Sequence, residues 1–194
     1  MTHLKKVLVS AYSSLDNTIE QNGEILRFFR DDARGYRDSR VDHPVIMGGT
    51  TFRGLLERHN SIIPARTNII ISSTLNPWSK DIDVSEENTT PHYFASEHNM
   101  VPFRVPVFPT IDAALEYARF IDDRVFIAGG RSTINAALPL VNRLEITELH
   151  KEVEGKNKFP EIDLEIWEEV FRQKKYDHSF VTYVRKVTSL DKQD

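Results

Sequence analysis

The chain has 194 residues, of which 40% are hydrophobic and 28% are charged, and its formal net charge is −4. This composition is typical of a soluble globular protein, and the weakly acidic balance argues against a nucleic-acid or anionic-membrane partner. The chain contains no cysteine, which excludes disulfides and thiol catalysis and is compatible with a reducing cytoplasm. No apolar run reaches membrane-spanning length, and no pair of histidines has the spacing of metal ligands. We therefore expect a cytoplasmic protein without a metal.

In the first half of the chain, short apolar runs alternate with segments of helical pattern. The run from Lys6 to Tyr12 is typical of a strand, and Asn22-Gly23 after it is a strong turn signal. Between Glu24 and Arg40 the apolar residues recur at helical spacing. The strands predicted for this half are 6–12, 44–47, 68–71 and 92–95, and the predicted helices are 24–40 and 50–58.

The second half continues the alternation and ends in a hairpin. An amphipathic helix is predicted for 111–120, with Thr110 as its N-cap, and another helix should follow Gly129-Gly130. The predicted strands of this half are 125–128, 144–153, 167–175 and 180–187, the last two forming an antiparallel hairpin around Asp177-His178. This alternation predicts an α/β fold whose sheet is mostly parallel with an antiparallel edge. No change in composition marks a boundary, so residues 1–194 are expected to form one domain.

Two segments share the order strand, glycine pair, helix. Gly48-Gly49 follows the strand at 44–47, and Gly129-Gly130 follows the strand at 125–128. In such a turn the bare backbone and the N–H groups at the helix start can approach a phosphate, and a Cβ would keep the ligand away. A tight strand-to-helix turn without a ligand produces the same pattern, so each motif alone carries little weight.

Four longer motifs carry a resemblance to a known family. They are PVIMGGTTF (44–52), IPARTNIIISS (63–73), VFIAGGRSTINAALP (125–139) and LEITELHKEVEGKNKFP (144–160), with Trp167 downstream. In this order and spacing the chain resembles dihydrofolate reductases over nearly its whole length. The resemblance implies a mostly parallel eight-stranded sheet with about four helices, and an oxidoreductase that uses NADPH to reduce 7,8-dihydrofolate to 5,6,7,8-tetrahydrofolate. It also implies a monomer that supports one-carbon metabolism, thymidylate synthesis and nucleotide synthesis, and that binds antifolate inhibitors.

The resemblance assigns the catalytic residues and the residue that binds the substrate tail. Hydride transfer to an imine carbon requires protonation of the neighbouring nitrogen, and a partly buried carboxylate suits this task because desolvation raises its pKa. The family's acid corresponds to Asp32, with Asp31 as the alternative, and Thr147 corresponds to the threonine that hydrogen-bonds it. Without the resemblance, both aspartates would be read as solvated charges near a helix start. Arg66 corresponds to the arginine that pairs with the folate tail carboxylate, a contact suited to its planar guanidinium.

The remaining site residues are also implied by the resemblance. The pterin and benzoyl pocket is expected to be lined by Ala11, Ala33, Tyr36, Leu55, Ile63 and Ala128. The NADPH site is expected to comprise Ile19, Gly48, Gly49, Thr50, Thr51, Ser72, Ser73, Ala128, Gly129, Gly130, Arg131, Ser132 and Thr133. The family also has a cis Gly-Gly bond at the second glycine pair, which Ala128–Gly129 or Gly129–Gly130 would match. For the apolar members of both sets, packing in the core is the alternative reading.

Several positions depart from the family pattern. The first loop lacks a Pro-Trp pair, with Leu26 and Arg27 in its place, and Gly49 replaces a basic residue, which weakens the preference for NADPH over NADH. The family's tyrosine after the second glycine pair is also absent. The stretch 12–17 is similar to the pyrimidine reductases of riboflavin synthesis, which share the fold and the cofactor. Two alternatives therefore stay open, a reductase of that type and a non-catalytic member of the fold.

Overall fold

The computed structural model describes residues 6–13, 18–21, 24–25, 42–59, 63, 66–73, 92–95 and 104–186. Within these residues the chain forms a nine-stranded sheet and a separate two-stranded sheet. The strands of the large sheet are β1 (Lys6–Ser13), β4 (Val45–Gly48), β5 (Asn68–Ile71), β6 (His92–Ala95), β7 (Arg104–Phe108), β8 (Arg124–Ile127), β9 (Arg143–Leu149), β10 (Trp167–Lys174) and β11 (His178–Arg185). The small sheet pairs β2 (Glu20–Gln21) with β3 (Glu24–Ile25).

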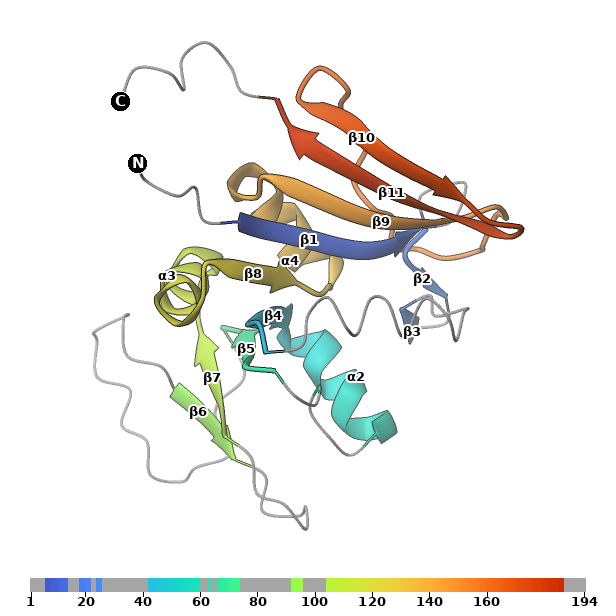
Figure 1. The fold of residues 1–194 in the computed structure, drawn as a ribbon. Coiled ribbons are helices and arrows are strands. Elements are labelled where there is room, and N and C mark those ends of the chain that lie inside the picture. The colour runs from blue at the N-terminus through green and yellow to red at the C-terminus, as the bar shows by residue number, and fades with distance from the viewer. Residues whose placement is uncertain are drawn as a thin grey trace, which may run out of the picture.

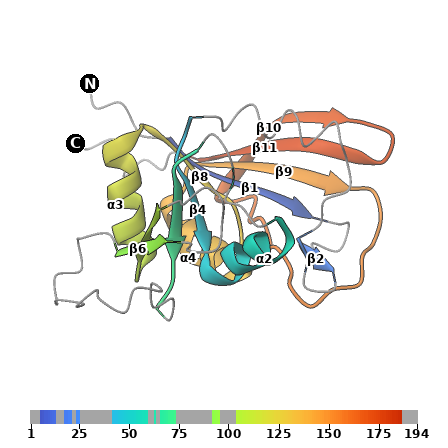
Figure 2. The ribbon, with the colours of Figure 1, turned by 90° about the horizontal axis from the view of Figure 1, so that it is seen from below.

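The large sheet has the order β10-β11-β9-β1-β8-β4-β5-β7-β6 (Figure 1). The strands from β9 to β7 in this order run parallel to one another. The hairpin of β10 and β11 forms one antiparallel edge, and β6 forms another at the opposite side. Figure 2 shows the hairpin and β9 at one end of the molecule and β6 at the other. The predicted parallel sheet with an antiparallel C-terminal edge is confirmed, and β6 adds a second antiparallel edge.

The expectation of eight strands is wrong by one strand in the described part of the chain. Each of the eight predicted strands is present, those at 68–71 and 92–95 with the predicted bounds and the other six with shifted ends, and the ninth is β7, which the sequence pattern does not indicate. β7 contains Pro106, which cannot donate a hydrogen bond to a neighbouring strand and makes such a segment look like a loop. In the sheet, Pro106 lies opposite Tyr93 of β6, while β7 pairs with β5 through Val107 and Phe108, beyond the proline.

Three of the four expected helices lie in the described residues. They are α2 (Gly49–His59), α3 (Ile111–Ile121) and α4 (Arg131–Ala137), and α4 continues into a 3₁₀ turn, η1 (Leu138–Leu140). The change at Leu138 has a local cause, because Pro139 has no N–H group for a helical hydrogen bond. The fourth predicted helix, 24–40, is wrong at its start, where Glu24 and Ile25 form β3. The rest of it lies outside the described residues.

Strand ends near the hairpin also differ from the prediction. β9 ends at Leu149 rather than Val153, because the chain turns at His150, whose backbone N–H donates to the Asp177 carbonyl at 2.8 Å. β11 already begins at His178, which the sequence pattern places in the turn. The predicted start of α3 is confirmed, since the Thr110 side chain accepts a hydrogen bond from the third residue after it, at 3.3 Å.

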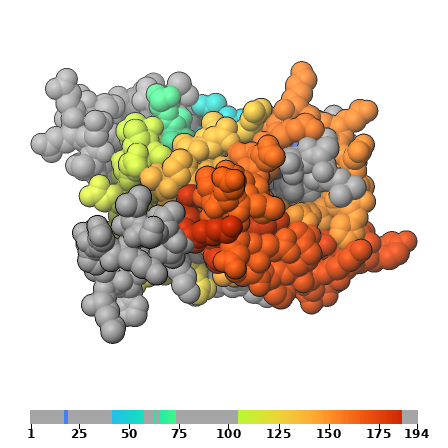
Figure 3. All heavy atoms as spheres, turned by 90° about the horizontal axis from the view of Figure 1, so that it is seen from above, coloured from blue at the N-terminus to red at the C-terminus, as the bar shows by residue number. Residues whose placement is uncertain are grey.

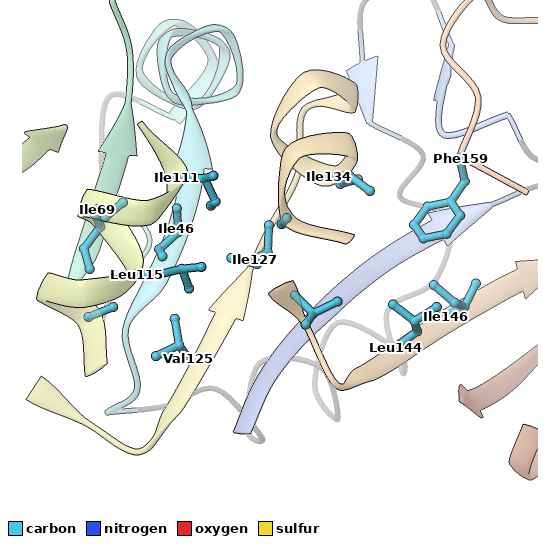
Figure 4. Packing of buried hydrophobic residues seen from close by; sticks show 14 of the residues in the cluster. Ile46, Ile69, Ile111, Leu115, Val125, Ile127, Ile134, Leu144, Ile146 and Phe159 are labelled. Atoms are coloured by element: carbon cyan, nitrogen blue, oxygen red, sulfur yellow. The ribbon is translucent and has the colours of Figure 1, made fainter. Parts of the chain in front are cut away.

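Alternating side chains of the central strands build a core on each face of the sheet. One face packs against α3 and α4 (Figure 4) and presents Ile46, Ile69, Val125 and Ile127. The other face packs against Phe52 and Leu55 of α2 and presents Val45, Met47, Ile70 and Phe126. Because successive side chains of a strand point to opposite faces, strands buried on both sides are apolar throughout. The helices therefore cover both faces and leave the ends of the parallel strands free to form a site.

Candidate functional site

The two glycine turns leave the sheet at the same edge, side by side. β4 and β8 are parallel neighbours, with Ile46 opposite Ile127, and the Ala128 N–H donates to the Ile46 carbonyl at 2.8 Å. One step further, the Gly48 N–H donates to the Gly129 carbonyl at 3.4 Å. The segments read separately in the sequence as strand, glycine pair and helix are therefore in direct contact.

The connections after these two strands run in opposite directions. α2 leads from β4 to β5 on one side, whereas α4 leads from β8 to β9, which lies beyond β1 on the other side (Figure 1). The two helices also cover opposite faces of the sheet. In open α/β sheets, the place where successive connections diverge leaves a crevice outside the carboxyl ends of the strands, and ligands bind there.

A third strand contributes hydroxyl groups at the same edge. β5 lies beside β4, with Ile71 opposite Gly48, so Ser72 and Ser73 follow directly beside the first glycine turn. The Ser72 N–H donates to the Phe108 carbonyl at 2.9 Å. Ser72 is half-buried and Ser73 is exposed.

Apolar residues expected to line the substrate pocket meet in the core on the α2 side of the sheet. Leu55 of α2 is buried, and Ile63 and Ala128 pack against the same core cluster. Three of the residues expected to line a substrate pocket thus lie in one group, brought together from three separate segments. Arg66 lies nearby in sequence to Ile63 and is partly exposed, as a residue that binds a ligand at a pocket mouth must be.

Asn68 holds the segment between Ile63 and Arg66 in place, a role that the sequence pattern does not indicate. Its side chain is buried, and its amide donates to the Ile63 carbonyl at 2.8 Å and to the Arg66 carbonyl at 3.1 Å. Its side-chain oxygen accepts from the Ile63 N–H at 3.2 Å. The only hint of this role in the sequence is that a polar residue, Asn68, begins an otherwise apolar strand.

The sequence profile of the dihydrofolate reductase family matches residues 7–101 and 93–186, which together span almost the whole chain. This chain belongs to the dihydrofolate reductase family. The dihydrofolate reductase of Haemophilus influenzae is 25% identical over 181 residues, covering 90% of this chain and 95% of that protein. One from Haloferax volcanii is 27% identical over 180 residues, covering 93% and 83%.

A solved structure has the same fold. It is the dihydrofolate reductase from Enterococcus faecalis complexed with NADP(H) and RAB-propyl, with a TM-score of 0.72 and 21% sequence identity. The superposition covers 95% of this chain and 98% of that one. At this identity the match supports the fold, and the four ordered motifs together with the family profile support the membership.

The residues at the glycine turns fit the diphosphate of the cofactor of dihydrofolate reductases. Gly129 and Gly130 have φ angles of 117° and 81°, which side-chain-bearing residues rarely adopt. At Gly130 an added Cβ would lie 3.1 Å from Thr51 Oγ1, so a side chain there would make a tight contact as well as a strained backbone. The first turn of α2 contains no acidic residue that would repel a phosphate. A diphosphate at these turns would be bound by backbone N–H groups and by the hydroxyls of Thr50, Ser72 and Ser132.

Other residues assigned from the reductase resemblance are placed less completely. Thr147 is buried in β9, opposite Tyr12 of β1 and Phe180 of β11. Ala11 lies in β1 opposite Ile146, and only its backbone is described. Asp31, Asp32, Ala33 and Tyr36 lie outside the described residues. No peptide bond in the described part of the chain is cis, so the cis Gly-Gly bond implied by the resemblance is not found.

The first loop of the reductase fold is tied to the segment that follows β9. Ile19 is buried in the same core cluster as Phe159, and its N–H donates to the Asn157 carbonyl at 2.9 Å. Thr18 forms an antiparallel bridge with Lys158. Ile19 is therefore held by contacts with residues far along the chain. Of the other residues expected in the NADPH site, Arg131 and Ser132 at the start of α4 are exposed.

Metal-ligand groups and membrane-spanning helices are both absent from the described residues. No group of three His, Cys, Asp or Glu side chains there could hold a metal ion. No helix there is long and apolar enough to cross a membrane.

Proposed function

We propose that this chain reduces 7,8-dihydrofolate to 5,6,7,8-tetrahydrofolate with NADPH as the hydride donor. Membership in the dihydrofolate reductase family carries this proposal. It is supported by the contact between the two glycine turns, which lie where the connections after β4 and β8 run to opposite sides of the sheet. The product serves one-carbon metabolism and thymidylate synthesis. We further propose that the protein works as a cytoplasmic monomer with a single domain and that antifolates compete with its substrate.

The proposed cofactor site lies over the ends of β4, β5 and β8. Gly48 to Thr51 and Ala128 to Thr133 would hold the diphosphate, and Ser72 with Ser73 would meet the adenosine 2′-phosphate. Bound NADPH supplies the hydride. No basic side chain stands at Gly49 to pair with the 2′-phosphate, so discrimination against NADH is expected to rest on these hydroxyls.

The proposed proton path depends on one carboxylate near the pterin. Asp32, with Asp31 as the alternative, would bind the pterin amino group and ring N–H and would favour protonation of the ring nitrogen beside the reacting carbon. Thr147 would hydrogen-bond this carboxylate from β9, where it is buried. Burial raises the pKa of a carboxylate in general, and a carboxyl group with a raised pKa suits proton relay near neutral pH.

The proposed contact with the substrate tail is made by Arg66. A guanidinium forms two parallel hydrogen bonds to a carboxylate, and dihydrofolate carries a glutamate tail. The Asn68 amide holds the Arg66 carbonyl, which limits the positions that this side chain can reach. A ribosylamino-pyrimidine phosphate has no such tail, so Arg66 favours the folate substrate over the riboflavin-type alternative.

The experiment that tests the proposal measures the loss of NADPH absorbance with dihydrofolate and identifies the product by chromatography. The same protein is assayed with NADH and, separately, with a ribosylamino-pyrimidine substrate. Turnover with dihydrofolate and none with the pyrimidine is the expected result. A folded sample that binds NADPH but turns over neither substrate would reject the enzymatic proposal, and light scattering tests the monomer.

A further inference from the structure

The first observation concerns why position 48 is glycine. Gly48 does not have the positive φ angle that glycine alone adopts readily, so backbone conformation is not the reason. A Cβ built on Gly48 would lie 2.6 Å from Thr133 Oγ1 and 3.9 Å from Thr133 Cβ. Carbon and oxygen atoms that are not bonded do not approach this closely. The space that a side chain at position 48 would need is therefore occupied by the Thr133 hydroxyl.

The second glycine turn is filled in the same way by the opposite helix. A Cβ on Gly130 would lie 3.1 Å from Thr51 Oγ1 and 3.5 Å from Thr133 Oγ1. Thr51 belongs to α2 and Thr133 to α4, so each helix places a threonine against the glycine turn that precedes the other. We call Gly48, Thr51, Gly130 and Thr133 the glycine–threonine interlock.

Thr133 cannot easily move away from Gly48. Its side chain is buried, so the close-packed surroundings limit the space into which its hydroxyl could turn. α4 itself is fixed at its far end by Arg185, which donates to the carbonyls of Leu138 and, at 2.9 Å, Val141. The Arg185 guanidinium also lies 4.6 Å from the centre of the Trp167 ring. A group added at position 48 would therefore push the two turns apart rather than displace Thr133.

We propose that Thr133 is a positioning residue whose hydroxyl, by filling the space over Gly48, sets the separation of the two glycine turns and so the affinity for NADPH. The inference rests on the proposed function, because it assumes that these turns hold the cofactor. The contact of the Thr133 hydroxyl with the space over Gly48 is steric, so what it contributes there is its volume. Removing the hydroxyl should make room for a methyl group at position 48.

The test is a double-mutant cycle with a matched control. Gly48→Ala should raise the Kd for NADPH by about tenfold or more, equivalent to about 1.4 kcal/mol, and should lower the unfolding temperature of the protein without cofactor. Thr133→Ala alone should raise the Kd for NADPH severalfold, because it leaves the space over Gly48 empty and removes the group that sets the separation of the turns. The double variant G48A/T133A should recover both, because the atom that collides with the new methyl group is gone. The control G48A/T133V should recover neither, because valine has the same volume as threonine.

Cofactor binding is measured by calorimetry and unfolding by circular dichroism. Equal behaviour of G48A/T133A and G48A/T133V would overturn the inference, as would a Gly48→Ala variant that binds NADPH like the wild type. If Gly48→Ala alone does not fold, recovery of folding by Thr133→Ala but not by Thr133→Val supports the interlock. A wild type that folds but does not bind NADPH would instead reject the proposed function, and the unfolding temperatures would still decide whether the interlock exists.

Discussion

At the scale of single residues, the proposed chemistry depends most on the carboxylate at position 32. If Asp32 supports protonation of the substrate, Asp32→Asn should lower the hydride-transfer rate at neutral pH by about 10²–10⁴-fold, the usual contribution of such a group. Part of the rate should return at low pH, where the substrate is protonated by the solvent. Stopped-flow measurement of NADPH oxidation across pH gives the profile. The same profile in Asp31→Asn, with Asp32→Asn active, would move the assignment by one residue.

Arg66 and its support by Asn68 predict a selective loss of substrate affinity. Arg66→Ala should raise the KM for dihydrofolate and leave that for NADPH nearly unchanged, because a charge-assisted contact to the tail is worth roughly 1.5–3 kcal/mol. Asn68→Ala should produce a smaller change of the same kind, because it removes the amide that binds the Ile63 and Arg66 carbonyls. Steady-state kinetics with both ligands measures this. Equal effects of Arg66→Ala on the two ligands would mean that Arg66 is structural.

Residue roles were predictable where they follow from the chain within a few positions. The Thr110 cap could be predicted because the two residues of its hydrogen bond, Thr110 and Ala113, lie within one helical turn. Asn68 could not, because its function depends on a loop that returns over the start of β5. The use of Gly48 could not either, since the atom that requires glycine there belongs to Thr133, far along the chain.

At the scale of elements, prolines mark where prediction from local pattern fails. Pro106 makes β7 look like a loop in the sequence. The residues on either side of the proline nevertheless pair with β6, and Val107 and Phe108 pair with β5. Pro139 ends α4 earlier than the apolar spacing indicates, although Val141 is still buried in the core. In both places tertiary packing keeps a segment in the sheet or the core although its local sequence predicts a loop.

Arg172 joins the C-terminal hairpin to β9 through two carboxylates. Its guanidinium lies 2.5 Å from Glu148 Oε2 and 2.8 Å from Glu169 Oε1. Figure 3 shows the face of the molecule on which the C-terminal segments lie, in orange and red. The hydrogen bond from Arg172 lowers the pKa of Glu169. Burial, together with the charges of Glu148 and Glu169, raises the pKa of Tyr183 beside them to about 12. Without the arginine, two carboxylates would face each other.

Arg172→Met should therefore lower the free energy of unfolding at neutral pH by roughly 1 kcal/mol. A carboxylate whose pKa is lowered by folding stabilises the protein above its unfolded pKa, 4.5 for Glu169, and this stability is lost as the pH falls through the folded pKa. The difference between variant and wild type should shrink below that range, as urea unfolding at several pH values would show. Arg143→Met, which removes a single ion pair with Glu145 at 3.0 Å, is the control and should have a smaller effect. A difference that stays constant down to acid pH would contradict this account.

At the scale of the whole molecule, the site depends on a strand order that local patterns do not contain. The alternation of strands and helices predicts a parallel sheet, but not that β1 is inserted between β8 and β9. That insertion makes the connection after β8 cross to the opposite side from the one after β4, and the crevice follows from it.

The last prediction concerns the loop from Ser13 to Arg27, which in the family closes over the nicotinamide. Its Thr18 and Ile19 are tied to Lys158 and Asn157, so any closing motion has a fixed point there. Leu26 and Arg27, which replace a Pro-Trp pair, lie outside the described residues. Leucine offers no donor to hold a bridging water, and arginine brings a charge that prefers solvent. We therefore expect catalysis with a more mobile lid and weaker exclusion of water.

The double substitution Leu26→Pro and Arg27→Trp should tighten dihydrofolate binding and slow hydrogen exchange in the loop when both ligands are bound. Fluorescence titration measures the affinity, and hydrogen exchange followed by mass spectrometry measures the protection of residues 13–27. Val170→Ala, on the exposed edge strand β10, is the control and should alter neither quantity. The expectation fails if the wild-type ternary complex already holds Leu26 and Arg27 packed in an ordered lid over a fully buried substrate, because the substitution would then have no mobility to remove.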